Sequence, residues 1–357
     1  MTKKIIISTY DDIKNPHYAG GGAYAVHKSA KELSRKFDVE VITGRYFGAK
    51  NEKVEGVAYR RIGIAFGGPK LGQIVYQLLL PSIVRKNNFD VWVENFTPPF
   101  STSFLPLFTK KPVIGLVHML SASDMKRKYK LPFDLVENFG LKKYNKFIVT
   151  QNQIKNEVKL QNKKASIVVI PNGIEKIQTF ASPKRYILFI GRLEVNQKGL
   201  DLLLESYKKA NIPQKLVLAG SGEAKQLTIL KKYITRLKLD SKVILKGKVN
   251  SIQKQKLLSS AICVVVPSRF ETFSMVCLES LSAGVPLISF NIPGLKWIPN
   301  GLSIKIRPFD TEKLSHAIGE VAKNHKTHDA IAKKGKKYAN KFNWEYVGRE
   351  YIKAVSI

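Results

Sequence analysis

The sequence predicts an α/β protein built from two doubly wound, Rossmann-like parallel-sheet domains. Its length of 357 residues exceeds what a single hydrophobic core usually organises. Short β-branched segments alternate with amphipathic segments, a pattern typical of parallel sheets that helices cover on both faces. A turn-rich stretch at residues 171–183 interrupts this alternation, which then starts again. Two such series indicate two sheets.

Residues 1–172 are expected to form the N-terminal domain. Helices are predicted between its strands, for example at residues 23–36 and 151–161, where apolar side chains recur at helical spacing. The buried strands of this domain are predicted at residues 4–9, 39–43, 91–94, 113–118, 146–150 and 167–170.

Residues 173–340 are expected to form the C-terminal domain, and residues 341–357 a helix that packs back on the N-terminal domain. Ligands of open parallel sheets bind beyond the carboxyl ends of the strands, so we expect the two domains to face each other across a ligand cleft. The strands of the second domain are predicted at residues 186–190, 215–219, 243–246, 262–266 and 286–289.

The chain has 60 Lys and Arg residues against 27 Asp and Glu, a formal net charge of +33. Residues 1–171 carry 28 basic and 13 acidic side chains and residues 172–357 carry 32 and 14, so the excess is not a basic tail. Lysine outnumbers arginine 48 to 12, whereas specific nucleic-acid recognition favours the planar guanidinium. A lysine-rich proteome or attraction to an anionic membrane surface explains this charge better than nucleic acid does.

Three further features indicate the cellular compartment of the protein. Cys263 and Cys277 are the two cysteines, too few for a disulfide framework, which suits a reducing compartment. The first residues show no apolar secretory segment with a small-residue cleavage site. No window of about 20 uninterrupted apolar residues is present. We therefore expect a cytoplasmic protein that does not cross a membrane.

The segment 271–279, Glu-Thr-Phe-Ser-Met-Val-Cys-Leu-Glu, follows a predicted strand and opens a predicted helix. Glu271 is expected in the loop and Glu279 one to two turns into the helix. Carboxylates accept hydrogen bonds from sugar hydroxyls, and the free N–H groups of a helix start suit a phosphate. The alternative is an ordinary helix, in which Glu271 interacts favourably with the helix dipole and Glu279 has no special role.

Basic residues follow the first strand of the second domain. Arg192 comes directly after that strand, and Lys198 precedes the next predicted helix. Such a pair can hold a diphosphate and stabilise the charge that develops on it. The chain contains no Asp-x-Asp sequence, so a metal-held diphosphate lacks an obvious pair of ligands. Two solvated cations near a loop are the alternative.

Two features of the N-terminal domain lie beyond predicted strand ends. Three glycines at residues 20–22 precede a helix, and they allow the backbone to approach a ligand closely. Their spacing does not match the Gly-x-Gly-x-x-Gly of dinucleotide-binding proteins. His118 stands at the carboxyl end of the fourth strand. A flexible loop and a structural histidine are the alternatives.

The segment 271–286 resembles the donor-binding motif of the GT4-type retaining glycosyltransferases of the GT-B fold. These enzymes have two Rossmann-like domains and transfer a sugar from a nucleotide donor with retention of anomeric configuration. The resemblance implies that Glu279 binds the ribose hydroxyls and Glu271 the hydroxyls of the transferred sugar. The family commonly has glycines where this chain has Thr272 and Ser274, which leaves the identity of the sugar open.

The resemblance extends to the other motifs. It implies that Arg192 and Lys198 hold the donor diphosphate, that the glycine loop faces the diphosphate and the acceptor, and that His118 lies beside the transferring sugar. The residues assigned to the donor are Gly21, Gly22, Arg192, Lys198, Gly222, Lys248, Val249, Glu271, Phe273, Ser274, Met275, Val276 and Glu279, and those assigned to the reaction are His118, Glu271, Arg192 and Lys198.

These inferences predict a metal-independent, retaining glycosyltransferase of the hexosyltransferase type. Its donor is expected to be a nucleotide-diphosphate sugar, a UDP- or GDP-sugar, with no other cofactor. The cationic segment 126–130 and the apolar segments 76–84 and 96–108 suit a lipid or lipid-linked glycan acceptor, or a cell-surface glycan precursor, at an anionic membrane. The enzyme would then be peripheral on the inner face of the cell membrane.

Two other functions remain open at this point. A nucleotide-sugar epimerase could use the same fold and donor site. A non-catalytic protein that binds nucleic acid or a membrane through its charge is a different class, but the basic runs are not interleaved with aromatic residues as a base-stacking platform requires.

Overall fold

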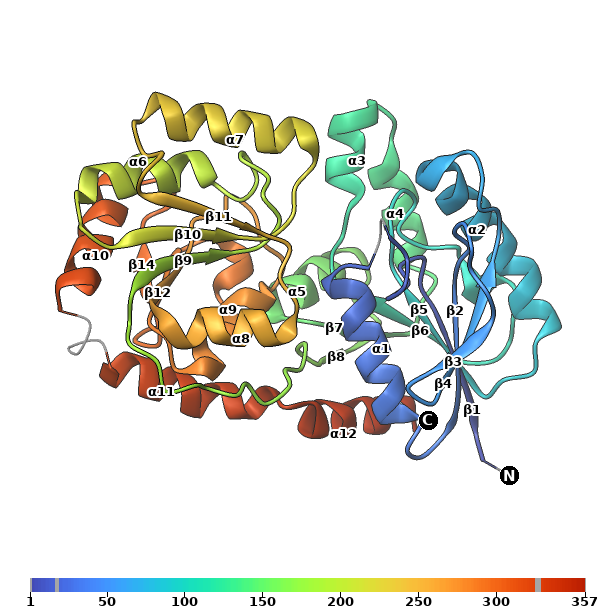
Figure 1. Cartoon of the computed structure of the whole chain (residues 1–357). Coiled ribbons are helices and arrows are strands. Elements are labelled where there is room, and N and C mark those ends of the chain that lie inside the picture. Colours follow the sequence, from blue (N-terminus) through green and yellow to red (C-terminus); the bar gives the residue numbers. More distant parts are fainter. Residues whose placement is uncertain (1, 17–18, 325–328, 357) are drawn as a thin grey trace. The chain divides into compact units, whose positions relative to one another are not determined.

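The computed structural model describes residues 2–16, 19–324 and 329–356 (Figure 1). The chain divides into two compact units. Unit 1 comprises Met1–Gly173 and Trp344–Ile357, and unit 2 comprises Ile174–Asn343. Each unit contains a largely parallel sheet with helices on both faces, which confirms the predicted fold class.

The sheet of unit 1 has eight strands in the order β3-β4-β2-β1-β5-β6-β7-β8. All neighbours are parallel except β3 and β4, which form a hairpin that the sequence analysis missed. Glu55 and Gly56 turn this hairpin with φ of 47° and 88°. The strands are β1 Lys4–Ser8, β2 Asp38–Gly44, β3 Glu52–Val54, β4 Val57–Ile62, β5 Val91–Asn95, β6 Val113–Val117, β7 Lys146–Val149 and β8 Ser166–Val169.

The helices of unit 1 bury both faces of its sheet. Alternation along β1 sends Ile5 and Ile7 to one face, against α1 and α12, and Ile6 to the other, with Tyr76 of α2. α12 packs on α1, as expected for the last helix of the chain. The helices are α1 Gly21–Leu33, α2 Gly68–Lys86, the short η1 Leu105–Leu107, α3 Ala122–Tyr129, α4 Phe133–Leu141, α5 Asn152–Gln161 and α12 Trp344–Val355.

The sheet of unit 2 has six parallel strands in the order β11-β10-β9-β12-β13-β14. β14 was not predicted. The strands are β9 Tyr186–Ile190, β10 Lys215–Ala219, β11 Val243–Gly247, β12 Ala261–Val266, β13 Leu287–Phe290 and β14 Ile304–Ile306. The helices are α6 Leu200–Ala210, α7 Ala224–Arg236, α8 Ser251–Ser260, α9 Met275–Ala283, η2 Pro293–Leu295, α10 Thr311–Lys323, α11 Asp329–Ala339 and η4 Asn340–Phe342. Among the described residues, no helix has both the length and the apolar character needed to span a membrane.

The unit boundary near the C-terminus differs slightly from the expected one. The sequence analysis ended the second domain at residue 340, whereas unit 2 continues to Asn343. The reason is aromatic packing, because the ring of Phe342 lies 5.4 Å from that of Trp297 and 5.3 Å from that of Tyr338. These contacts hold η4 in the core of unit 2.

Candidate active site

Predicted site residues follow four neighbouring strands of unit 2. Lys248 comes after β11, Gly222 after β10, Arg192 after β9 and Glu271 after β12. Because these strands are parallel, their carboxyl ends meet at one edge of the sheet. The fold therefore brings together residues that are up to 79 positions apart in sequence, from Arg192 to Glu271.

The loops at this edge are in close backbone contact. The N–H of Gly191 donates to the carbonyl of Ala219 at 3.0 Å, and the N–H of Leu193 donates to Ser221 at 2.7 Å. A Cβ atom on Gly220 would lie 1.7 Å from the carbonyl oxygen of Gly191. Glycine is therefore required at residue 220 for the β9 and β10 loops to meet.

An ion pair joins two of the predicted residues. The Nζ atom of Lys198 lies 2.7 Å from Oε1 of Glu271, and the hydroxyl of Ser268 donates to the same oxygen at 2.7 Å. Both charged side chains are partly accessible, at 19% for Lys198 and 11% for Glu271. A polar ligand can therefore reach a fixed cation and a fixed carboxylate side by side. The sequence analysis missed Ser268, which lies in the turn before Glu271.

The η2 segment packs against the loop that carries Glu271. A Cβ atom on Gly294 would come within 1.7 Å of the carbonyl oxygen of Glu271. The indole N–H of Trp297 donates to the carbonyl of Phe273 at 2.5 Å, and the two rings stack with centroids 4.5 Å apart. The side chain of Phe273 is thus buried in the core, and only its backbone is left to meet a ligand.

The start of α9 has no side-chain cap. Ser274 precedes the helix with φ 59° and ψ 92°, its side chain accepts no capping hydrogen bond, and the first turn contains no acidic residue. The first N–H groups of an α-helix lack intrahelical acceptors. Met275 and Val276, the first two helical residues, therefore present amides and the positive end of the helix dipole, which favour an anion.

Glu279 lies farther along α9 and is buried. Its carboxylate is paired with the ammonium group of Lys254, on α8. Burial raises the pKa of Glu279, and the charge of Lys254 opposes that increase. The sequence analysis did not find Lys254. Its only signal is a position in the first turn of a helix whose capping box pairs Asn250 with Gln253.

Arg192 and Lys198 lie on one loop but do not point at the same partner. Arg192 is exposed and donates from Nη2 to the amide oxygen of Gln197 at 2.6 Å. Arg269, which the sequence analysis missed, donates to both carboxylate oxygens of Asp201, at 2.8 and 2.7 Å. Arg269 thereby ties the segment before Glu271 to the start of α6.

The predicted residues of unit 1 lie at the carboxyl edge of its own sheet. Gly21 and Gly22 form the first turn of α1, whereas the sequence analysis began that helix at residue 23. Glycine has low helix propensity, so the pattern did not include them. The carboxylate of Asp11, after β1, lies 3.5 Å from the position of a Cβ atom on Gly22. Burial raises the pKa of Asp11 to about 6.

His118 is the first residue after β6, which ends at Val117. Its Nε2 atom is buried and has no hydrogen-bond partner among the residues that the structure describes. The loop after it is fixed by the buried carboxylate of Glu137 on α4, which accepts from the N–H groups of Ser121 and Ala122 at 3.1 and 3.2 Å. The hydroxyl of Ser101 donates to the same carboxylate at 2.5 Å.

His118 is expected to remain neutral down to acidic pH. Burial lowers its pKa from 6.5 to about 4. Between these values the unfolded chain binds a proton that the folded chain excludes, so the free energy of unfolding should fall as the pH decreases from about 6.5 to about 4. An NMR titration of the imidazole signals, with His118→Gln to assign the signal, should give a midpoint near 4. A midpoint near 6.5 would contradict this environment.

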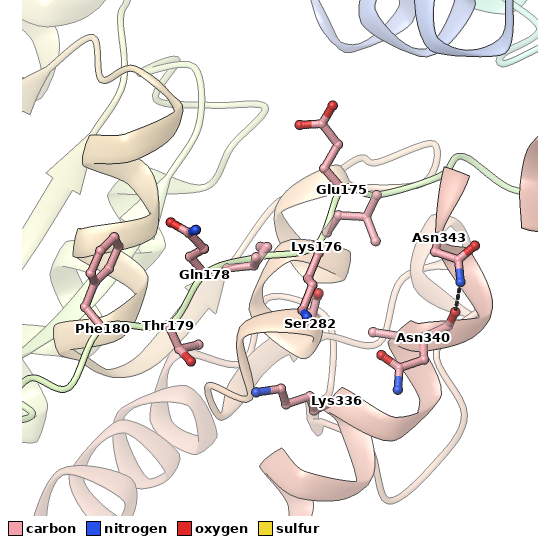
Figure 2. A pocket seen from close by; sticks show the side chains of 12 residues that line it. Glu175, Lys176, Gln178, Thr179, Phe180, Ser282, Lys336, Asn340 and Asn343 are labelled. Carbon is pink, nitrogen blue, oxygen red and sulfur yellow. Dashed lines mark hydrogen bonds between the residues drawn. The ribbon is translucent and has the colours of Figure 1, made fainter. Parts of the chain in front are cut away.

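A cavity of about 700 Å³ lies elsewhere in unit 2 (Figure 2). It is bordered by residues 174–180, by Ser282 near the end of α9, and by Lys336 and Asn340. The amide of Asn343 donates to the carbonyl of Asn340 at 3.1 Å along its edge. None of the predicted site residues is among those that line this cavity.

Family models match both halves of the chain. The model for Glycosyltransferase Family 4 matches residues 19–176, and the model for Glycosyl transferases group 1 matches residues 172–338. The chain belongs to the GT4-type glycosyltransferases. Two uncharacterized glycosyltransferases of Methanocaldococcus jannaschii are 31% and 30% identical to it, over 49% and 56% of this chain. The chain spans about half of those relatives, 45% and 56% of their lengths.

Other similar proteins match over a larger share of the chain. A GDP-mannose:cellobiosyl-diphosphopolyprenol alpha-mannosyltransferase of Xanthomonas oryzae is 25% identical over 84% of this chain and 80% of its own. Sucrose-phosphate synthase of Thermosynechococcus elongatus has a similar structure, with a TM-score of 0.82 at 20% identity over 98% of this chain and 97% of that one. The structure of HepE of Anabaena in complex with UDP-glucose has a TM-score of 0.77 at 16% identity and covers 99% of both chains. The fold is therefore GT-B.

Proposed function

We propose that this protein transfers a sugar from a nucleotide-diphosphate sugar to a hydroxyl acceptor, with retention of anomeric configuration and without a divalent metal. The observation that carries the proposal is the arrangement around the start of α9. Lys198 pairs with Glu271 directly before this helix, and Glu279 lies within it. A cation, two carboxylates and free helical amides are the groups that a nucleotide sugar requires.

Each group takes a separate part of the donor in this proposal. Glu279, paired with Lys254, accepts hydrogen bonds from the ribose hydroxyls. Glu271, oriented by Ser268, accepts from hydroxyls of the transferred sugar. Arg192, Lys198 and the α9 amides hold the diphosphate. Positive charge at the diphosphate stabilises the leaving group as the glycosidic bond breaks, a role that a divalent metal has in other transferases.

The chemical step follows from retention. The bond from the anomeric carbon to the diphosphate oxygen breaks, and the acceptor oxygen bonds to that carbon on the same face. The departing diphosphate oxygen takes the proton of the acceptor hydroxyl. Neutral His118 donates or accepts one hydrogen bond to the donor sugar or the acceptor, and it is not assigned as a general base.

The donor is proposed to be a UDP- or GDP-sugar. The complex of HepE with UDP-glucose supports a UDP-sugar. The GDP-mannose in the name of the Xanthomonas relative supports a GDP-sugar. Neither identifies the sugar that this chain uses.

Calorimetric titration of UDP, GDP, ADP and CDP in EDTA tests the donor site. We expect selective binding of one nucleotide, and roughly tenfold or greater loss of affinity in Glu279→Ala and in Arg192→Ala, because each removes charged hydrogen bonds. Arg185→Ala is the matched control, since this exposed arginine precedes β9 at the opposite edge of the sheet. Absence of nucleotide binding, or equal losses in the control, would contradict the donor site.

The acceptor is proposed to be a lipid-linked or cell-surface glycan precursor, with the enzyme on the cytoplasmic face of the cell membrane. The polyprenol acceptor in the name of the Xanthomonas relative supports a lipid-linked class. The net charge of +33 supports attraction to an anionic surface.

A further inference from the structure

One side of α4 exposes apolar side chains to solvent. Leu135 is 66% exposed and Phe139 52%, and Leu131, just before the helix, is 55% exposed. The spacing of four residues places Leu135 and Phe139 on one side of the helix. Glu137 and Leu141 are buried on the other side. The side of α4 that faces solvent thus presents large apolar side chains at Leu135 and Phe139.

The apolar surface extends beyond α4. The ring of Phe139 lies 5.9 Å from that of Phe104, the residue before η1, and Leu107 in η1 is 54% exposed. η1 contacts α2, where Leu78 is 70% exposed and Leu79 39%. We call this surface the α4 face, defined by Leu78, Leu79, Phe104, Leu107, Leu131, Leu135 and Phe139. Several large apolar side chains exposed on neighbouring elements mark an interaction site.

Basic side chains border the α4 face. The Nζ atom of Lys143 lies 4.2 Å from the ring centroid of Phe139, and the guanidinium of Arg85 lies 4.8 Å from that of Phe108. Lys128 and Lys70 both lie over Tyr129 at the end of α3, at 5.4 and 5.8 Å. The neighbouring sequence adds Arg127, Lys130, Lys110, Lys111 and Lys142. It also adds Lys126, which is paired with Asp134 of α4 at 2.7 Å.

We propose that the α4 face binds the surface of an anionic lipid bilayer. Leucine and phenylalanine side chains would enter the boundary between headgroups and acyl chains, while the lysine ammonium groups reach phosphate in the headgroup layer. A border of long flexible lysines around apolar side chains matches a lipid surface, which is fluid and negative, more closely than a protein of fixed shape. The inference rests on the proposed function, because it names the surface from which a lipid-linked acceptor would reach unit 1.

Vesicle flotation with the full chain tests the proposal. With vesicles of phosphatidylglycerol and phosphatidylcholine at low salt we expect the protein to float, and with phosphatidylcholine alone to float far less. Leu135→Asn combined with Phe139→Asn should lower the bound fraction roughly tenfold or more, because two apolar side chains no longer enter the bilayer. Lys128→Gln combined with Lys143→Gln should weaken binding at low salt and reduce its dependence on salt.

Leu160→Asn combined with Lys164→Gln is the control. Leu160 is 76% exposed on α5 of the same unit, outside the α4 face. Equal flotation of the control and the α4-face variants would overturn the proposal, as would binding that is insensitive to vesicle charge. Nucleotide titration of every variant separates this result from the proposed donor site, since loss of flotation with unchanged nucleotide affinity concerns the α4 face alone.

Discussion

Lys198→Ala is expected to lower the rate of sugar transfer by a factor on the order of 100 to 1,000, the usual cost of removing one group that stabilises charge in a transition state. Lys198 is the cation that the structure fixes beside Glu271, at 2.7 Å. In the proposed reaction Lys198 stabilises the negative charge that develops on the leaving diphosphate. The measurement is kcat and KM for the donor once the donor nucleotide is known, and the larger change is expected in kcat.

Two further variants separate this role from the loss of an ion pair. Lys209→Ala also removes a lysine that is paired with a glutamate in unit 2, but Lys209 and Glu312 are on the surface at 45% and 67% exposure. Transfer by this control should be unchanged. Lys198→Arg keeps the charge and should retain more activity than alanine. If Lys198→Ala and Lys209→Ala had the same rate, the assignment of Lys198 to the diphosphate would be wrong.

The sequence predicted both sheets because buried parallel strands are near-continuous apolar runs. The segments around Ile5–Ile7 and Ile187–Ile190 are of this kind, and each lies at the centre of its sheet. The same geometry accounts for the proximity of Lys198 and Glu271, which follow the neighbouring parallel strands β9 and β12. β3 and β14 were missed because strands of three residues are too short for a periodic pattern. β4 was missed because Arg60 and Arg61 interrupt its apolar run.

Other parts of the candidate site depend on contacts between distant segments. Nothing near Lys254 in the sequence indicates that it pairs with Glu279, because the contact requires α8 and α9 to be packed. In the sequence, Gly294 resembles part of an ordinary Pro-Gly turn. Only the structure shows that it packs against the carbonyl of Glu271. Sequence pattern thus predicts which groups gather at a strand edge, whereas the residues that orient them emerge only from tertiary packing.

Gly199→Ala is expected to destabilise the protein by about 2–5 kcal/mol, the sum of two costs. Gly199 has φ +64°, and an alanine in this left-handed region costs about 1–2 kcal/mol. An alanine Cβ would also lie 2.0 Å from the carbonyl oxygen of Pro267, the residue directly after β12, and moving that backbone adds roughly 1–3 kcal/mol. Urea unfolding followed by far-UV circular dichroism measures the total.

Gly301→Ala carries the first cost alone, so its difference from Gly199→Ala measures the second. Gly301 has φ +80°, and no atom lies within 4 Å of a Cβ placed there, so only the backbone strain of about 1–2 kcal/mol should remain. The close approach at Gly199 also connects stability with the site, because Gly199 sets the distance between Lys198 and the segment of Ser268 and Glu271. Gly199→Ala should therefore weaken nucleotide binding in the fraction that stays folded, while Gly301→Ala should leave it unchanged. Equal destabilisation by both substitutions would show that the contact with Pro267 does not constrain the loop.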